Sequence, residues 1–139
     1  MNPSIRLFRR YRAFSAAERR SIWRAWPVLW GVRILLSVSS YRWLEAQILG
    51  RPLAARGSRS AADIAMGVER AARLVVAPTC LTRSLAAAWL LRGAGYVPRL
   101  HIGVANGADG FKAHAWLECD GDVLIGGEIK DEFHPFTRH

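Results

Sequence analysis

The chain has 139 residues, 51% of them hydrophobic and 22% charged, and a mean hydropathy of +0.06, which is typical of one compact domain and excludes a disordered tail. Its net charge is +9, and the excess lies in residues 1–73, which contain 14 of the 20 Lys and Arg but 4 of the 11 Asp and Glu. The longest apolar stretch, residues 26–38, contains Arg33 and has 13 residues, too few to span a bilayer, which takes about 20.

The first predicted helices lie in this basic half. Ser15 and Glu18 have the spacing of a capping box, so we expect a helix to start there. Pro27 must kink this helix or open a new one. The helical pattern resumes over residues 41–48 and stops at a glycine and a proline, which leaves residues 51–59 as a basic loop.

Tryptophans and arginines dominate the same region. Trp23, Trp26, Trp30 and Ile34 recur at three- and four-residue spacing, which predicts an anchoring stripe along one helix face. The arginines beside it are Arg6, Arg9, Arg10, Arg12, Arg19, Arg20 and Arg24. They fit a solvated face, a docking surface for an acidic partner, or peripheral contact with a membrane. No nucleic-acid-binding motif accompanies them, so nucleic acid is not an expected partner.

Two more helices are predicted in the middle of the chain. Ser60 and Asp63 give a second capping signal, and apolar residues follow at helical spacing as far as Val75. This helix must end before the next proline. Thr79 can then cap a helix that begins at Cys80 and stops at a pair of nearby glycines.

The remaining part of the chain changes to a period of two. Apolar residues alternate over 99–104, and residues 106–110 turn the chain back. In the strand that follows, residues 111–119, Cys119 shares the apolar face and His114 the polar face. A hairpin turn at an Asp-Gly pair leads to a last strand over 122–125. We therefore predict an α+β fold, in which N-terminal helices precede a helix carrying Cys80 that packs on a small antiparallel sheet.

Cys80 and His114 are the candidates for chemistry. The free amides at a helix N-terminus favour a thiolate, which is the nucleophilic form of cysteine, and Cys80 has that placement. His114 can serve as the general base. Both residues also fit ordinary packing roles, because cysteine is often buried and a histidine on a strand can be held by a neighbour. The cysteine count and the absence of a recognisable signal peptide predict reduced thiols and a cytoplasmic location.

Two longer segments carry a resemblance. Cys80-Leu-Thr-Arg-Ser-Leu-Ala-Ala-Ala-Trp-Leu-Leu-Arg-Gly-Ala-Gly-Tyr-Val-Pro-Arg-Leu-His-Ile-Gly-Val104, followed by Phe111-Lys-Ala-His-Ala-Trp-Leu-Glu118 and an Asp-Gly turn, closely resembles the transglutaminase-like leader peptidases of lasso-peptide biosynthesis. The resemblance covers residues 78 to about 136. It implies a papain-like Cys-His-acid hydrolase that cuts a ribosomally made precursor between leader and core, with Cys80 as nucleophile and His114 as base.

The third catalytic residue departs from the family pattern. Family members often carry Asn-Asp shortly after the Asp-Gly turn, where this chain has Leu124-Ile-Gly-Gly-Glu128. In a hairpin turning at Asp120-Gly121, paired residue numbers sum to 241, so Glu128 is one step out of phase with His114, and a bulge at Gly126-Gly127 would correct this. We predict Glu128 as the orienting acid, although it fits equally well a solvated charge at a strand end. Asp120 lies too far along the strand, and Asp122 has the opposite facing.

The resemblance also implies partners. These are the precursor's leader peptide, a separate winged-helix leader-recognition protein, and an amidotransferase-like cyclase that closes the ring. We expect a single domain, 1–139, with a basic helical region over 1–59 and a transglutaminase-like catalytic core over 60–139. Trp116 and His101 are candidates for substrate binding, Cys119 is a core residue, and no cofactor or metal site is expected. The alternatives are acyl transfer to an amine by the same Cys-His pair, or a non-catalytic scaffold that binds precursor, membrane or nucleic acid.

Overall fold

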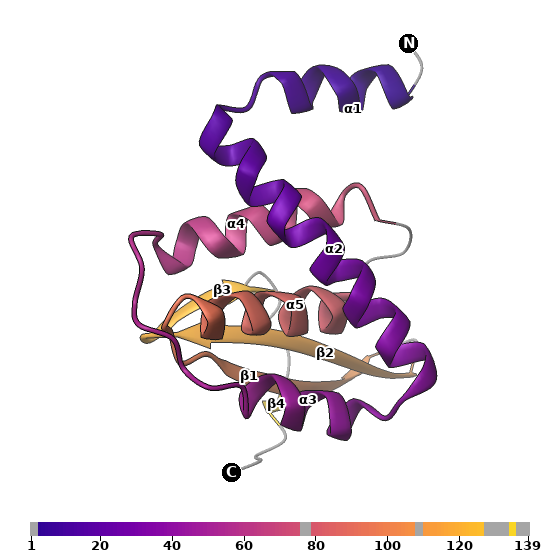
Figure 1. Ribbon diagram of the computed structural model, residues 1–139. Helices are drawn as coiled ribbons and strands as arrows, with labels where there is room; N and C mark the ends of the chain where they lie inside the picture. The colour runs from indigo at the N-terminus through magenta and orange to yellow at the C-terminus, as the bar shows by residue number, and fades with distance from the viewer. Residues whose placement is uncertain (1–2, 76–78, 108–109, 127–133, 136–139) are drawn as a thin grey trace.

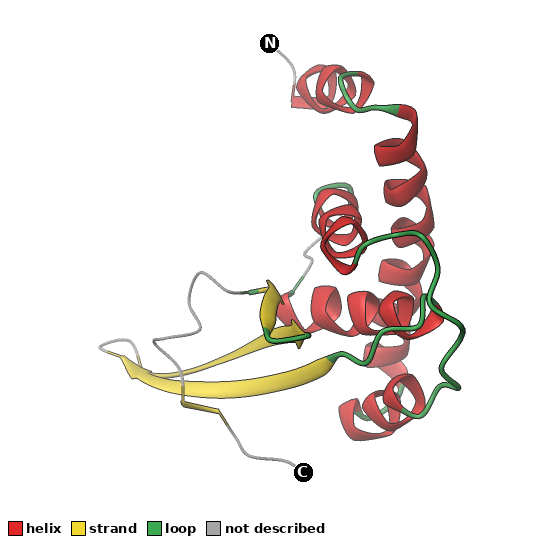
Figure 2. Ribbon diagram, turned by 90° about the vertical axis from the view of Figure 1, so that its left-hand side faces the viewer, coloured by secondary structure: helices red, strands yellow, loops and turns green. Residues whose placement is uncertain are grey.

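The computed structural model describes residues 3–75, 79–107, 110–126 and 134–135. Within these residues, helices precede an antiparallel sheet of strand order β3-β2-β1-β4, and the helices gather on one side of the sheet (Figures 1 and 2). The predicted α+β fold is confirmed. The helices are α1 (Pro3–Arg12), α2 (Ala16–Val38), α3 (Tyr41–Leu49), α4 (Ala61–Ala72) and α5 (Cys80–Gly93), and the strands are β1 (Arg99–Gly107), β2 (Gly110–Cys119), β3 (Asp122–Ile125) and β4 (His134–Pro135).

The predicted helix starts are present as capped N-termini. At the start of α2, the Ser15 hydroxyl accepts from the Glu18 amide and the Glu18 carboxylate accepts from the Ser15 amide, which is the predicted capping box. Pro27 lies inside α2 and does not divide it. Helix α1 was not predicted; it starts with Pro3, which suits the first helical position. Helix α4 ends at Ala72, before the predicted end at Val75. Val75 is nevertheless buried, in the turn that follows the helix.

Helix α5 is the centre of the core. It packs against α2, α3, α4 and β2, and its buried residues point to all sides rather than to one. Three consecutive alanines, Ala86–Ala88, have no exposed surface, and such small side chains let the neighbouring elements approach closely. This packing fixes the position of the N-terminus of α5, where Cys80 lies.

The sheet has the predicted hairpins. Asp120 and Gly121 both have positive φ angles, 52° and 86°, as the turn between β2 and β3 requires. Cys119 lies in the core, as predicted, at 3% exposure. The pairing passes from Glu118 with Val123 to Leu117 with Ile125, so a β-bulge shifts the register within β3.

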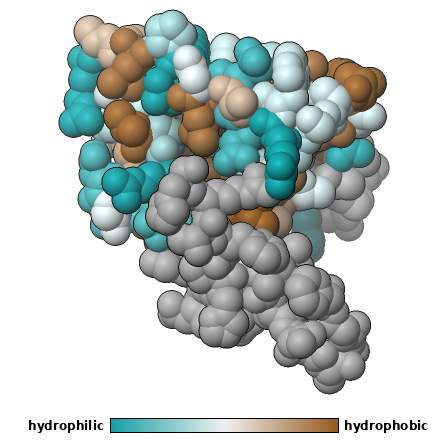
Figure 3. All heavy atoms as spheres, turned by 90° about the horizontal axis from the view of Figure 1, so that it is seen from below, coloured by the Kyte–Doolittle hydropathy of each residue, from teal (hydrophilic) through white to brown (hydrophobic). Residues whose placement is uncertain are grey.

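Most of the tryptophan stripe of α2 faces outward. The core side of this helix consists of Ile22, Ala25, Leu29 and Val32, whereas Trp23 is 59% exposed. Trp23 and Trp26 therefore do not anchor α2 to the core, but Trp30 is partly buried and packs against it. Figure 3 shows the molecule from below. On the coloured part of this surface, hydrophobic residues are scattered among hydrophilic ones.

Candidate active site

Cys80 is the first residue of α5 and is partly exposed. Thr79 caps the helix, and its hydroxyl accepts from the Thr82 amide at 3.1 Å. The cap leaves the Cys80 thiol beside the first turn, where backbone amides without a helical partner favour an anion. The predicted position of Cys80 at the N-terminus of a helix is confirmed, and this position suits a nucleophile.

A second element holds the thiol. The Ala115 amide of β2 donates to Cys80 Sγ at 3.4 Å. Strand β3 ends at Ile125, the partner of Leu117, so the Ala115 amide lies beyond the described pairing with β3 and is available to the sulfur. This contact joins the start of α5 to the residue that follows His114 in β2.

His114 is almost buried, at 7% exposure, and its ring is held by the backbone. Its Nε2 lies 3.2 Å from the carbonyl oxygen of Gly126, just after β3. A carbonyl oxygen can only accept, so Nε2 is the donor in this contact. The contact fixes the orientation of the ring.

Gly126 was not predicted as a site residue, beyond its possible role in a bulge. Its φ is +76°, and a Cβ placed there would lie 2.9 Å from His114 Nε2 and 2.8 Å from the Ala115 carbonyl oxygen. Only glycine allows both this backbone conformation and this approach of the imidazole. The sequence signal was the Gly126-Gly127 pair, which marks a special backbone position but does not reveal the ring against it.

Trp116 and His101, predicted to bind substrate, form a stack beside His114. The Trp116 ring lies between the two imidazoles, with ring centroids 6.5 Å from His114 and 5.4 Å from His101. His101 Nε2 lies 3.4 Å from the carboxylate of Glu118. At 2% exposure Trp116 contributes chiefly packing, and the partly exposed His101 and Glu118 form the accessible end of the stack.

Glu128 lies outside the described residues, and its catalytic role stays a prediction. The register shift that this prediction required is nevertheless present among the described pairs. Cys119 pairs with Asp122, but Leu117 pairs with Ile125, so the sum of the paired numbers rises by one along β3. The shift lies between Val123 and Ile125 of β3, close to the Asp120-Gly121 turn, and not at Gly126-Gly127.

An ion pair helps to fix the start of α5 beside the site. Arg83, one turn beyond Cys80, forms an ion pair with Glu69 of α4 at 2.9 Å, which ties the start of α5 to its neighbour. Among the described residues no three His, Cys, Asp or Glu side chains are grouped to hold a metal. A cavity of about 510 Å³ lies between α2, α3 and α5, but its lining includes Trp89 and not Cys80.

A family model described as the transglutaminase-like superfamily matches residues 28–138, a range that contains Cys80, His114 and the sheet. The chain belongs to the transglutaminase-like superfamily. Comparisons with curated proteins and with solved structures give no match. This superfamily includes cysteine peptidases and transglutaminases, and its chemistry is compatible with the geometry at Cys80. None of the described helices is long and apolar enough to cross a membrane.

Proposed function

We propose that this protein is a cysteine peptidase that removes the leader peptide from a lasso-peptide precursor in the cytoplasm. The observation that supports this most is the hydrogen bond from the Ala115 amide of β2 to Cys80 Sγ, because Ala115 is the residue that follows His114 in the chain. The motifs around both residues resemble those of lasso-peptide leader peptidases. Membership of the transglutaminase-like superfamily supports a thiol-based acyl step.

The proposed reaction has two acyl transfers. The Cys80 sulfur attacks the scissile carbonyl carbon while His114 Nδ1 takes the thiol proton. The tetrahedral oxyanion is stabilised by the Cys80 backbone amide, and it collapses as the protonated imidazole gives its proton to the leaving amine of the core peptide. The leader is then bound as a thioester. Water, deprotonated by His114, attacks this carbonyl, and the leader leaves with a new carboxyl group as the thiol is restored.

His114 must keep one orientation through both steps. The Gly126 carbonyl supports this by accepting from Nε2, which holds one edge of the ring. We propose Glu128 as the acidic member that stabilises the imidazolium. A neutral carbonyl and a carboxylate differ in this respect, because only the carboxylate strengthens its interaction when the ring becomes charged.

The proposed partners follow from the same family resemblance. A separate winged-helix protein would present the leader, and an amidotransferase-like cyclase would use the released amine of the core. His101 and Trp116 would line the route of the precursor beside His114. The fixed stack of their rings supports this, since a rigid wall can orient a peptide near the nucleophile.

The test is cleavage of a lasso precursor, followed by mass spectrometry, in the presence of the leader-binding protein. Wild type and Cys119→Ala should both release a leader fragment and a core fragment whose masses sum to the precursor plus one water. Cys80→Ala should release neither. Cys119 is the matched control because it is the other free thiol of the chain and is buried away from the site.

Other outcomes identify the alternatives. A product in which an amine replaces water would show acyl transfer. Binding of the precursor without cleavage by wild type, even with the cyclase and ATP present, would favour a scaffold and refute the peptidase. Glu128→Gln with unchanged cleavage would remove Glu128 from the mechanism.

A further inference from the structure

Helix α2 is apolar on two opposite sides. Its core side is buried, yet its outward side also carries large apolar residues: Trp23 is 59% exposed, Ile34 57% and Val38 76%. A helix at the surface of a monomeric protein normally exposes polar residues on its outward side. A continuous apolar face of this kind marks a binding surface.

The tryptophans on this outward side are ordered by one another. Tyr11, Trp23, Trp26 and Trp30 form a chain of edge-to-face contacts with centroid distances of 6.1 to 6.4 Å. The Trp23 indole also donates to the Tyr11 hydroxyl, which ties α1 to α2. The aromatic surface is therefore preformed and does not depend on a partner for its shape.

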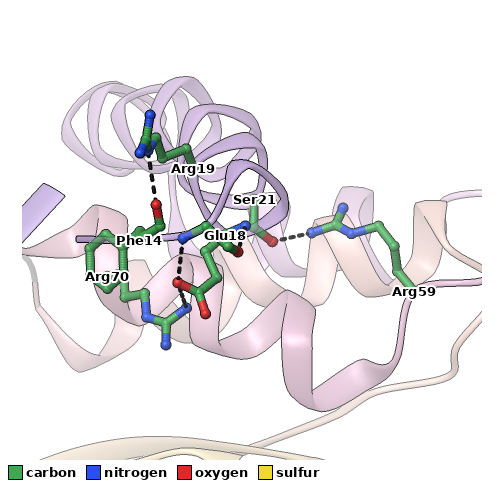
Figure 4. Close-up of polar contacts among 7 residues, drawn as sticks. Phe14, Glu18, Arg19, Ser21, Arg59 and Arg70 are labelled. Carbon is green, nitrogen blue, oxygen red and sulfur yellow. Dashed lines mark hydrogen bonds and ion pairs between the residues drawn. The ribbon is translucent and has the colours of Figure 1, made fainter. Parts of the chain in front are cut away.

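Positive charge surrounds this surface. Residues 1–38 contain a single acidic residue, Glu18, against the exposed arginines Arg6, Arg9, Arg10, Arg12, Arg20 and Arg24. Glu18 does not offset them at the outward face, because its carboxylate is used by the capping box and lies 3.9 Å from Arg70 of α4 (Figure 4). The surface thus combines cationic and apolar groups without a competing anion.

Helix α1 continues the same combination. It exposes Ile5 and Phe8 between its arginines, and it projects beyond the rest of the molecule (Figure 1). We propose that the outward face of α2, defined by Trp23, Trp26, Ile34, Val38 and the exposed arginines Arg20 and Arg24, binds the surface of an anionic lipid bilayer. This proposal is independent of the peptidase activity proposed above.

A bilayer surface matches this face better than an acidic peptide does. Anionic headgroups pair with arginine, while tryptophan and aliphatic side chains enter the boundary between headgroups and acyl chains. The 23 residues of α2 extend over about 35 Å, a length that a flat surface can contact throughout. Contact of this kind lies along the membrane, which agrees with the finding that no described helix could cross one.

The experiment is co-sedimentation of the full chain with large unilamellar vesicles, made of phosphatidylcholine alone or with 30% phosphatidylglycerol. We expect binding to the anionic vesicles at least tenfold stronger than to the neutral ones, with a steep loss as the salt concentration rises. Arg20→Glu with Arg24→Glu should weaken this binding tenfold or more. The control, Arg42→Glu with Arg99→Glu, has the same net charge on exposed residues outside the face and should change it much less.

A second pair of variants tests the apolar part. Ile34→Ser with Val38→Ser should weaken vesicle binding several-fold, whereas Met66→Ser with Val97→Ser, also exposed but off the face, should leave it unchanged. Circular dichroism should show all variants folded. The proposal is refuted if the protein does not bind anionic vesicles, or if face and control variants lose binding equally. It is also refuted if the face variants reduce only binding to an acidic peptide or protein, which would make this a protein-docking surface.

Discussion

Replacing Gly126 by alanine should displace the His114 ring in addition to lowering the free energy of unfolding. Alanine at a φ of +76° costs about 1–2 kcal/mol in the free energy of unfolding. The new Cβ would also lie 2.9 Å from His114 Nε2, whereas ordinary contacts begin near 3.4 Å, so the ring must move by about 0.5 Å. Since a displacement of about 1 Å in an active site can cost about a hundredfold in rate, we expect cleavage to slow by about tenfold or more.

Gly121→Ala is the matched control. Gly121 has a similar φ of +86°, but a Cβ there meets nothing within 4 Å, so it carries the backbone cost alone. The free energy of unfolding is measured by urea denaturation, and the site is probed by the rate of iodoacetamide alkylation at Cys80, resolved by peptide mapping, and by precursor cleavage. Gly126→Ala should lose more stability than Gly121→Ala, because its Cβ also lies 2.8 Å from the Ala115 carbonyl oxygen, and only Gly126→Ala should alter alkylation and cleavage. Equal alkylation and cleavage rates in the two variants would show that Gly126 does not position His114.

Four further predictions concern the thiols, a helix cap and the packing of the site. Burial, with a smaller contribution from nearby Asp120, raises the pKa of the Cys119 thiol above its ordinary value of 9.0, so iodoacetamide at neutral pH should label Cys80 first. In the folded protein Cys119 keeps its proton at a pH where the unfolded chain has lost it, so the stability that this thiol contributes should fall as the pH rises above about 9. Between pH 7 and 10 the urea midpoint of Cys119→Ala should therefore fall less than that of wild type. Identical slopes for the two proteins would contradict this. Thr79→Ala should cost about 1 kcal/mol and slow cleavage, whereas the cap variant Ser60→Ala on α4 should cost a similar amount by urea denaturation with cleavage unchanged. Trp116→Ala should lower the free energy of unfolding by about 3–5 kcal/mol, because the ring is 2% exposed and stacked on both sides, and a loss below about 1 kcal/mol would show that the stack contributes little.

Local signals predicted the elements that position the site. Ser15, Ser60 and Thr79 each mark the start of a helix, because a side-chain oxygen at the N-cap satisfies a free amide regardless of the surroundings. The alternation along β2 likewise placed Cys119 in the core and His114 on the opposite face. These features depend on neighbours within four residues, so they can be predicted before the fold is known.

Other features depend on residues that are distant in the chain. The helix spacing of the tryptophans was correct, but which side of α2 faces the core depends on α4 and α5, and Trp23 and Trp26 are exposed while Trp30 packs against the core. The hydrogen bond from the Ala115 amide to Cys80 spans 35 residues and needs β3 to end where it does. The position of the Gly126 carbonyl beside His114 also depends on distant residues, because it follows the β-bulge in β3, which no residue type in that strand predicts.

The sequence by itself determined the helix and strand boundaries near the site, because caps, turns and period-two alternation are local interactions, and it predicted Cys80 and His114 as candidates for chemistry. It also determined the basic character of the N-terminal half. Only the tertiary structure decided that the Cys80 thiol meets the amide after His114, that the Gly126 carbonyl accepts a hydrogen bond from the His114 ring, and that Trp23 and Trp26 face outward. These outcomes depend on how α5 packs between the other helices and the sheet, and such long-range packing has no signature in any short stretch of the chain.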